Sequence, residues 1–197
     1  ATLLAGALTI LGTGCNRLKS RDDLNKGVNA YRNAKYADAV NFFQEAIDLD
    51  PENGNARTYL AIAYMMQWIP GAESAENKQF ATKAREEFNK VLEKNAQDTT
   101  ALASLASLSY NEAQSLPNEE KMVKLDEAAK YNEQLIASDP KARDAFYSLG
   151  VISQNKFYPA LMSARLGAGM KADEPGPLKD KKVRAELKEK RSEEHTS

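Results

Sequence analysis

The sequence has few of the side chains that carry most enzyme chemistry. It holds one cysteine, Cys15, so an internal disulfide is excluded. It holds one histidine, His195, close to the C-terminus. The chain therefore has almost no residues that could form a histidine base, a Ser-His or Cys-His nucleophile, or a histidine-ligated metal site. We predict a protein that is not an enzyme, with no catalytic residues, no metal site and no cofactor.

His195 also lies in a stretch that we do not expect to be native sequence. Residues 191–197 read RSEEHTS, which resembles the translation of a common sequencing adapter. An ordinary polar tail is the alternative. We expect residues 191–197 to be a non-native tail, with the gene continuing differently beyond them.

Charge excess and phosphate-binding loops are absent too. The net charge is −1, so no basic surplus indicates nucleic acid as a partner. The glycines of residues 167–169 lack the flanking strand and lysine of a phosphate loop. The paired carboxylates at 22–23 and 119–120 fall at expected helix starts, where they compensate the helix dipole. We predict neither nucleic acid nor a small-molecule substrate as a ligand.

What the sequence does have is a helical hairpin at residues 27–51. Apolar residues recur every three or four positions, first up to Ala34 and again from Ala39 to Leu49. A short break at 33–36 separates the two stripes, and Pro51 ends the second. Ala, Lys, Glu and Leu are abundant and runs of β-branched residues are few, which favours an all-α chain.

This hairpin resembles the tetratricopeptide repeat, a helix-turn-helix unit of roughly 34 residues. The resemblance rests on the spacing of small, aromatic and proline positions, namely Gly27, Tyr36, Ala39, Phe43, Ala46 and Pro51. Imperfect copies follow, with repeat-packing positions at Ala84, Phe88, Ala128, Pro140 and Gly150. A generic helical bundle is the alternative. The resemblance implies an all-α solenoid of antiparallel helix hairpins wound as a right-handed superhelix.

The copies are longer than the first hairpin. Pro51, Ala96 and Pro140 mark equivalent stops, 45 and 44 residues apart. We expect the extra residues to lie between the helices of each pair, at 67–80 and 112–125. A fourth repeat opens at Ala142 and its first helix is expected to end near Asn155. We predict a repeat domain over 23–155, of about three and a half repeats, and an insertion in the incomplete fourth repeat over 156–190.

In this family the first helix of each pair lines a concave groove that binds peptides or helices of other proteins. The resemblance places these residues in the groove: Tyr31, Arg32, Thr58, Ile62, Met65, Met66, Ser107, Tyr110, Asn111, Tyr147 and Val151. Several of the apolar ones could instead only cover the neighbouring repeat. The lysine and asparagine clamp of chaperone-binding relatives would fall on Leu24 and Val28, so that specialisation is not expected.

The N-terminus resembles the signal of a bacterial lipoprotein. An apolar run over 1–11 and small residues at 12–14 precede Cys15, and the chain then turns polar. The resemblance implies a signal peptide at 1–14, lipidation of Cys15 and a polar tether at 15–22. A short buried helix with an inert thiol is the alternative. We therefore expect an anchor in a bacterial cell envelope, in the outer membrane facing the periplasm.

Three functions remain open from the sequence. The first is a lipid-anchored scaffold that binds peptide or helical segments of other proteins. The second is a component of an envelope assembly or secretion system, such as an outer-membrane or pilus-assembly lipoprotein. The third is a helical accessory domain of an enzyme whose catalytic part lies elsewhere.

Overall fold

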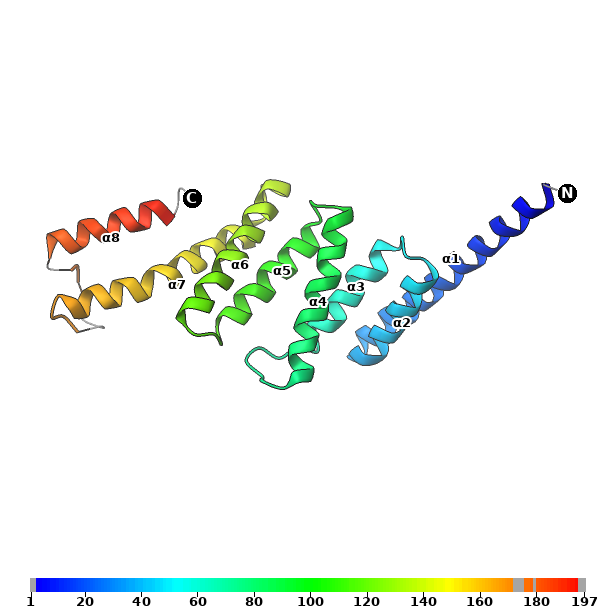
Figure 1. Cartoon of the computed structure of the whole chain (residues 1–197), viewed down its shortest axis with the longest axis horizontal. Helices are drawn as coiled ribbons and strands as arrows, with labels where there is room; N and C mark the ends of the chain where they lie inside the picture. The colour runs from blue at the N-terminus through cyan, green and yellow to red at the C-terminus, as the bar shows by residue number, and fades with distance from the viewer. Residues whose placement is uncertain (1–2, 172–175, 179, 195–197) are drawn as a thin grey trace. The chain divides into compact units, whose positions relative to one another are not determined.

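The computed structural model describes residues 3–171, 176–178 and 180–194, and the described chain is helical without strands. Residues 1–2 of the predicted signal, 172–175 and 179 of the predicted insertion, and His195 with the rest of 195–197 lie outside this description. The helices, shown in Figure 1, are α1 (Leu3–Arg32), α2 (Tyr36–Leu49), α3 (Gly54–Met65), α4 (Ala75–Lys94), α5 (Thr99–Ala113), α6 (Asn118–Ser138), α7 (Arg143–Gly167) and α8 (Lys181–Glu194). The predicted all-α class is confirmed.

The chain divides into two compact units, Ala1–Ala145 and Phe146–Ser197. In the first unit α1 packs on α2, α3 on α4 and α5 on α6, so consecutive helices form hairpins. Neighbouring hairpins contact one another through α2 and α3 and through α4 and α5. The first helices of successive hairpins also touch, α1 with α3 and α3 with α5.

One four-residue turn recurs between hairpins and sets the register of the repeats. It covers 50–53, 95–98 and 139–142, and in each the last N–H donates to the first carbonyl oxygen, at 2.9, 3.0 and 3.0 Å. Asn53 and Asp98 end the first two turns and accept from the N–H groups of Ala56 and Ala101, which caps α3 and α5. The stop marks Pro51, Ala96 and Pro140 are each the second residue after a helix.

Within the first hairpin, the helices touch through a glycine and an aromatic ring. A Cβ on Gly27 would lie 2.4 Å from Phe43 Cε1, so only glycine lets α1 approach α2 this closely. Phe43, Ala39 and Ala46 are fully buried in the same core. At the equivalent positions of later hairpins, Ala84, Phe88 and Ala128 are also fully buried.

The third hairpin departs from this pattern at one position. The register places Asn132 where the first two hairpins have Phe43 and Phe88. Asn132 is buried and its amide donates to the carbonyl of Ala128 at 2.8 Å, so its polar group is satisfied inside the helix. Four leucines supply the apolar volume of this hairpin instead, and all are fully buried: Leu102, Leu105, Leu108 and Leu125.

The extra residues of the later hairpins differ from the expectation of longer turns. The helix α2 has 14 residues, whereas α4 has 20 and α6 has 21. Only the connection at 66–74 is a long loop; that at 114–117 is short. Residues 75–80 and 118–125 instead extend the second helix, because Ser74 caps α4 and Glu119 and Glu120 stabilise the first turn of α6.

The predicted polar tether at 15–22 is helical in the structure and belongs to α1. Ser20 is fully buried, and its hydroxyl donates to the carbonyl of Ala46 at 2.8 Å. The amide of Asn53 donates to the same hydroxyl at 3.2 Å. The polar residues of this segment are therefore the exposed side of a packed helix. Because the hydroxyl of Ser20 bonds to a backbone carbonyl, no residue type in the sequence indicates this contact.

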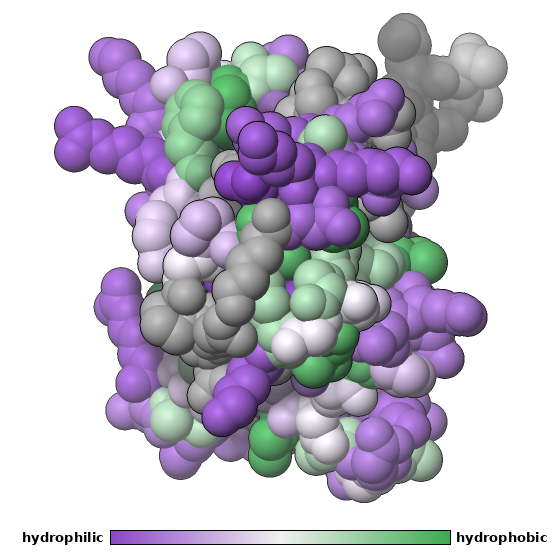
Figure 2. Space-filling view, turned by 90° about the vertical axis from the view of Figure 1, so that its left-hand side faces the viewer, coloured by the Kyte–Doolittle hydropathy of each residue, from purple (hydrophilic) through white to green (hydrophobic). Residues whose placement is uncertain are grey.

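The second unit contains most of α7 and α8. The first helix of the fourth repeat, expected to end near Asn155, continues to Gly167 with Pro159 inside it. Good helix formers at 160–166 continue the helix although proline removes one backbone hydrogen bond. Gly150, one of the predicted repeat-packing positions, is exposed, and a Cβ there would meet nothing within 4 Å. Figure 2 shows the face that lies at the left of Figure 1, which is largely hydrophilic with hydrophobic areas between the hydrophilic side chains.

The contrast between the two glycines gives the first prediction. Gly27→Ala should lower the free energy of unfolding by about 1–3 kcal/mol, because the new methyl group overlaps the ring of Phe43. The matched change Gly150→Ala places its methyl group in open space and should be neutral or stabilising by up to about 1 kcal/mol. Urea unfolding followed by circular dichroism measures both. Equal effects of the two changes would contradict the packing described for Gly27.

Candidate functional site

The first helices of the three hairpins present equivalent residues on one side of the repeat domain. Gly27, Ala61 and Ala106 occupy the same register position. One residue further along come Val28, Ile62 and Ser107, and four residues further along come Tyr31, Met65 and Tyr110. Gly27, Ala61 and Ala106 are buried, whereas the residues of the other two positions keep part of their area in solvent on helices that touch in succession, α1 with α3 and α3 with α5. We call this partly exposed surface the first-helix face.

On α1, this surface consists of apolar side chains, and the charged residue Arg32 follows them at the end of the helix. Leu24, Val28 and Tyr31 are half-buried and pack against the core of the first hairpin. The ring of Tyr31 meets that of Tyr36 edge-on, with centroids 5.5 Å apart. Burial raises the pKa of Tyr31, which keeps its phenol neutral. Arg32 is exposed at the end of the helix and is the only charged residue in the predicted groove set.

On α3 the surface is apolar and only half covered. Ile62 and Met65 pack against the core around Phe88 but keep part of their area in solvent, and Met66 is 47% exposed. Thr58 is half-buried and its hydroxyl donates to the carbonyl of Gly54. Ile62 and Met65 therefore have two roles: they cover the core of the second hairpin, and they leave part of their apolar area exposed to solvent.

On α5 the surface becomes polar. Ser107 is exposed, and the amide of Asn111 donates to its carbonyl at 2.9 Å and to its hydroxyl at 3.3 Å. Tyr110 is half-buried beside them. The predicted groove residues of α1, α3 and α5 thus lie on helices that contact one another in succession. The remaining two, Tyr147 and Val151, lie in the second unit; Tyr147 is 76% exposed and Val151 half-buried.

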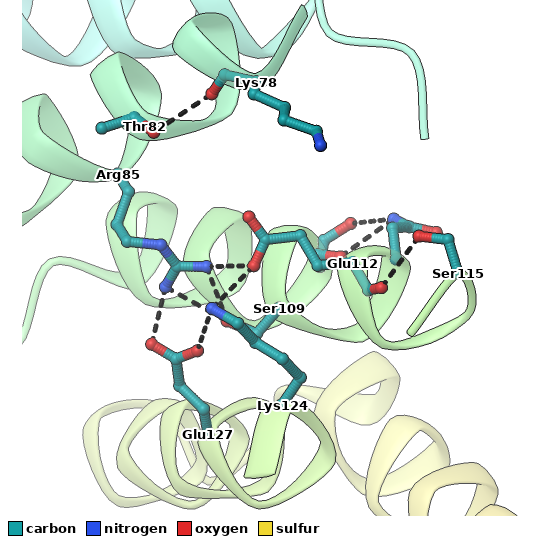
Figure 3. Close-up of polar contacts among 10 residues, drawn as sticks. Lys78, Thr82, Arg85, Ser109, Glu112, Ser115, Lys124 and Glu127 are labelled. Carbon is teal, nitrogen blue, oxygen red and sulfur yellow. Dashed lines mark hydrogen bonds and ion pairs between the residues drawn. The ribbon is translucent and has the colours of Figure 1, made fainter. Parts of the chain in front are cut away.

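A cluster of charges that the sequence analysis missed joins the second and third hairpins (Figure 3). Arg85 on α4 contacts Glu112 on α5 at 2.7 Å and Glu127 on α6 at 2.6 Å. Lys124 contacts the same two carboxylates at 2.8 and 3.0 Å. Ser109 lies within 3.4 Å of the Arg85 guanidinium. Two cations thus face two anions in a place where all four side chains are at most 30% exposed.

A second buried pair stabilises the second hairpin. Arg57 on α3 donates to Glu87 on α4 at 2.6 Å, and Lys90 contacts the other oxygen of that carboxylate at 2.6 Å. Burial, and then the negative charge of Glu87, raise the pKa of Tyr64 nearby. No sequence signal selects these partners, because they lie 30 residues apart and follow no repeat of their own.

Cys15, the predicted lipidation site, is a free and exposed thiol on α1. In the part of the chain that the structure describes, no helix is long and apolar enough to cross a membrane. Over those same residues, no group of His, Cys, Asp and Glu side chains is arranged to hold a metal ion.

Comparisons with known proteins agree with the fold. Residues 24–67 match the family model of the tetratricopeptide repeat. A search of curated proteins found no match. Among solved structures, the chain is similar to the first TPR of Spaghetti (RPAP3) bound to HSP90 peptide SRMEEVD, with a TM-score of 0.55 and 22% identity over 71% of this chain and 94% of that one.

Two further structures come from other organisms. The Arabidopsis OM64 TPR domain gives a TM-score of 0.52 and 19% identity over 71% of this chain and 98% of that one. A thermophilic TPR protein of Thermus thermophilus gives a TM-score of 0.56 and 16% identity over 86% of this chain and 80% of that one. At these identities the likeness establishes the fold. Residues 24–67 therefore contain a tetratricopeptide repeat, and the helical hairpins form a tetratricopeptide-repeat solenoid.

The charge cluster gives the second prediction. Arg85→Met should lower the free energy of unfolding by about 1–3 kcal/mol, because Glu112 and Glu127 then share only Lys124 in a poorly hydrated place. The matched change is Lys78→Met, which breaks the exposed Lys78–Glu73 pair and should cost less than about 0.5 kcal/mol. Both are measured by urea unfolding. A loss at Arg85 no larger than that at Lys78 would show that the cluster does not stabilise the stacking of the hairpins.

Proposed function

We propose that this chain is a non-catalytic scaffold that binds peptide or helical segments of partner proteins along its first-helix face and is held to a bacterial envelope membrane by a lipid on Cys15. The observation that carries the binding activity is the half-exposed surface of Val28, Tyr31, Ile62, Met65 and Tyr110. Tyrosine and methionine are typical of surfaces that accommodate peptides. A similar fold, the first TPR of Spaghetti, is known with a bound peptide.

The composition of this face indicates the kind of segment it would take. Arg32 is its one charge among the predicted groove residues, and carboxylates are absent from that set. An apolar or aromatic side chain would gain contact area against Ile62, Met65 and Met66. The hydroxyl and amide groups of α5 would suit the backbone or polar side chains of the same segment. We therefore propose an uncharged, amphipathic segment as the ligand.

The lipid anchor is supported by two observations. The residues before Cys15 have the pattern of a lipoprotein signal, and Cys15 itself is exposed and outside the packed core. A diacylated cysteine would attach the chain stably, since two acyl chains bind a bilayer far more strongly than one. An outer-membrane site facing the periplasm is part of this proposal.

Peptides selected from a random display library test the binding face. Met66→Ala and Tyr110→Ala should each weaken the affinity for the selected peptides by about tenfold, because each truncation removes contact area from the face. Val123→Ala is the matched control: Val123 on α6 is 67% exposed and lies outside the face. Fluorescence polarisation gives the dissociation constants. Peptides equally sensitive to Val123→Ala, or to none of the three changes, would refute binding at this face.

Mass spectrometry tests the anchor. In the protein purified from membranes of its own cells, the N-terminal peptide should begin at Cys15 and carry the mass of a diacylglyceryl group. Cys15→Ser should abolish both the modification and the membrane fractionation. An unmodified Cys15 in membrane-purified protein would eliminate the lipid anchor and leave the binding face untouched.

A further inference from the structure

The segment that follows Cys15 is docked onto the repeat domain almost at once. Arg17 faces Asp50 at 3.9 Å, and Ser20 is buried with its hydroxyl bonded to the Ala46 carbonyl. Cys15 lies two residues before Arg17 in the same helix, a rise of about 3 Å. No polar tether separates the cysteine from the packed domain, contrary to the expectation for 15–22.

The helices give the first unit two opposite edges, which α1 connects. The edge that Arg17 meets carries the turns 50–53, 95–98 and 139–142, and we call it the turn edge. Lys94, the last residue before the second of these turns, contacts Glu52 in the first turn at 2.9 Å. The opposite edge carries the connections 33–35, 66–74 and 114–117, and we call it the loop edge. There Gly71 lies beside Ser115.

The exposed chemistry next to Cys15 fits the surface of a bilayer. Leu18, one helical turn after Cys15, is 72% exposed. Arg17, Lys19 and Arg21 are exposed cations within the same two turns. The nearby carboxylates of Asp22 and Asp23 share Lys26, at 2.7 and 2.9 Å, and these hydrogen bonds raise the pKa of the lysine. An apolar side chain flanked by cations matches the boundary between acyl chains and anionic headgroups.

We infer that the turn edge of the repeat domain lies against the bilayer of anionic phospholipids to which Cys15 is anchored, while the loop edge points away from it. This inference rests on the proposed anchor at Cys15. The helix α4 spans the two edges and is 20 residues long, so the loop edge lies about 20–30 Å further from the headgroups than the turn edge. The exposed loop residues Met66, Ile69 and Pro70 are then presented to the aqueous side.

The chain is suited to a direct test because it has one cysteine and one tryptophan. Coupling Cys15 of the full chain to a maleimide phospholipid in phosphatidylglycerol-containing vesicles fixes the anchor chemically. Energy transfer from tryptophan to a dansyl-labelled headgroup then reports distance. Trp68 sits on the loop edge and should transfer weakly. The variant with Trp68→Phe and Gln97→Trp places the donor on the turn edge and should transfer at least about threefold more efficiently, given the separation of about 20–30 Å.

A linker variant completes the test. Replacing Asn16 by about twelve glycine and serine residues frees the domain from the anchor without touching Arg17 or Ser20, and should bring the two transfer efficiencies together. Equal efficiencies in the chain without the linker would overturn the orientation. Because the coupling is chemical, that result is independent of whether cells lipidate Cys15, which mass spectrometry decides. Circular dichroism of each variant confirms that the helices are intact.

Discussion

The close approach of the two helices in each hairpin is the constraint on which this structure depends. In the first hairpin it is met by a glycine against an aromatic ring, with no room for a single methyl group between Gly27 and Phe43. Ala61 and Phe88 occupy the same register positions in the second hairpin and share one core. Small residues at this contact let the helices lie side by side, so that both can bury an apolar stripe. The first-helix face is the side of α1, α3 and α5 that this packing does not cover, so its side chains stay half-exposed.

Stacking of successive hairpins depends on a different interaction. The recurring four-residue turn fixes where each first helix begins, because its internal hydrogen bond and the caps of Asn53 and Asp98 leave little freedom. Between the second and third hairpins, Arg85, Glu112, Lys124 and Glu127 add a set of contacts that fits only one relative placement. Three of its four residues belong to the third hairpin, where Asn132 replaces the aromatic residue. Charge geometry there supplies specificity, while leucines supply the buried area.

What could be predicted from the sequence was local. Gly27, Phe43 and the stops at Pro51, Ala96 and Pro140 are separated by fixed short intervals, so pattern alone identified the fold. The extra residues were expected between the helices at 67–80 and 112–125, but 75–80 and 118–125 belong to α4 and α6. The start of α6 itself agrees with the helix start expected at the paired carboxylates 119–120. The docking of 15–22 was missed because Ser20 bonds to a backbone carbonyl. The partners of Arg85 were missed because they depend on how hairpins stack. The predicted groove set came from register and stays a prediction of binding.

In the proposed function, α1 connects the anchor at Cys15 to the binding face. Its first packed turns hold Cys15 within one helical turn of the domain, and its later turns contribute Val28 and Tyr31 to the first-helix face. A flexible tether would let that face sample every orientation above a membrane. In the proposed arrangement, a rigid helix instead sets both the height and the direction of the face, so a partner segment would meet it in one geometry. For the proposed scaffold, restricting how partners approach is itself a means of selecting among them.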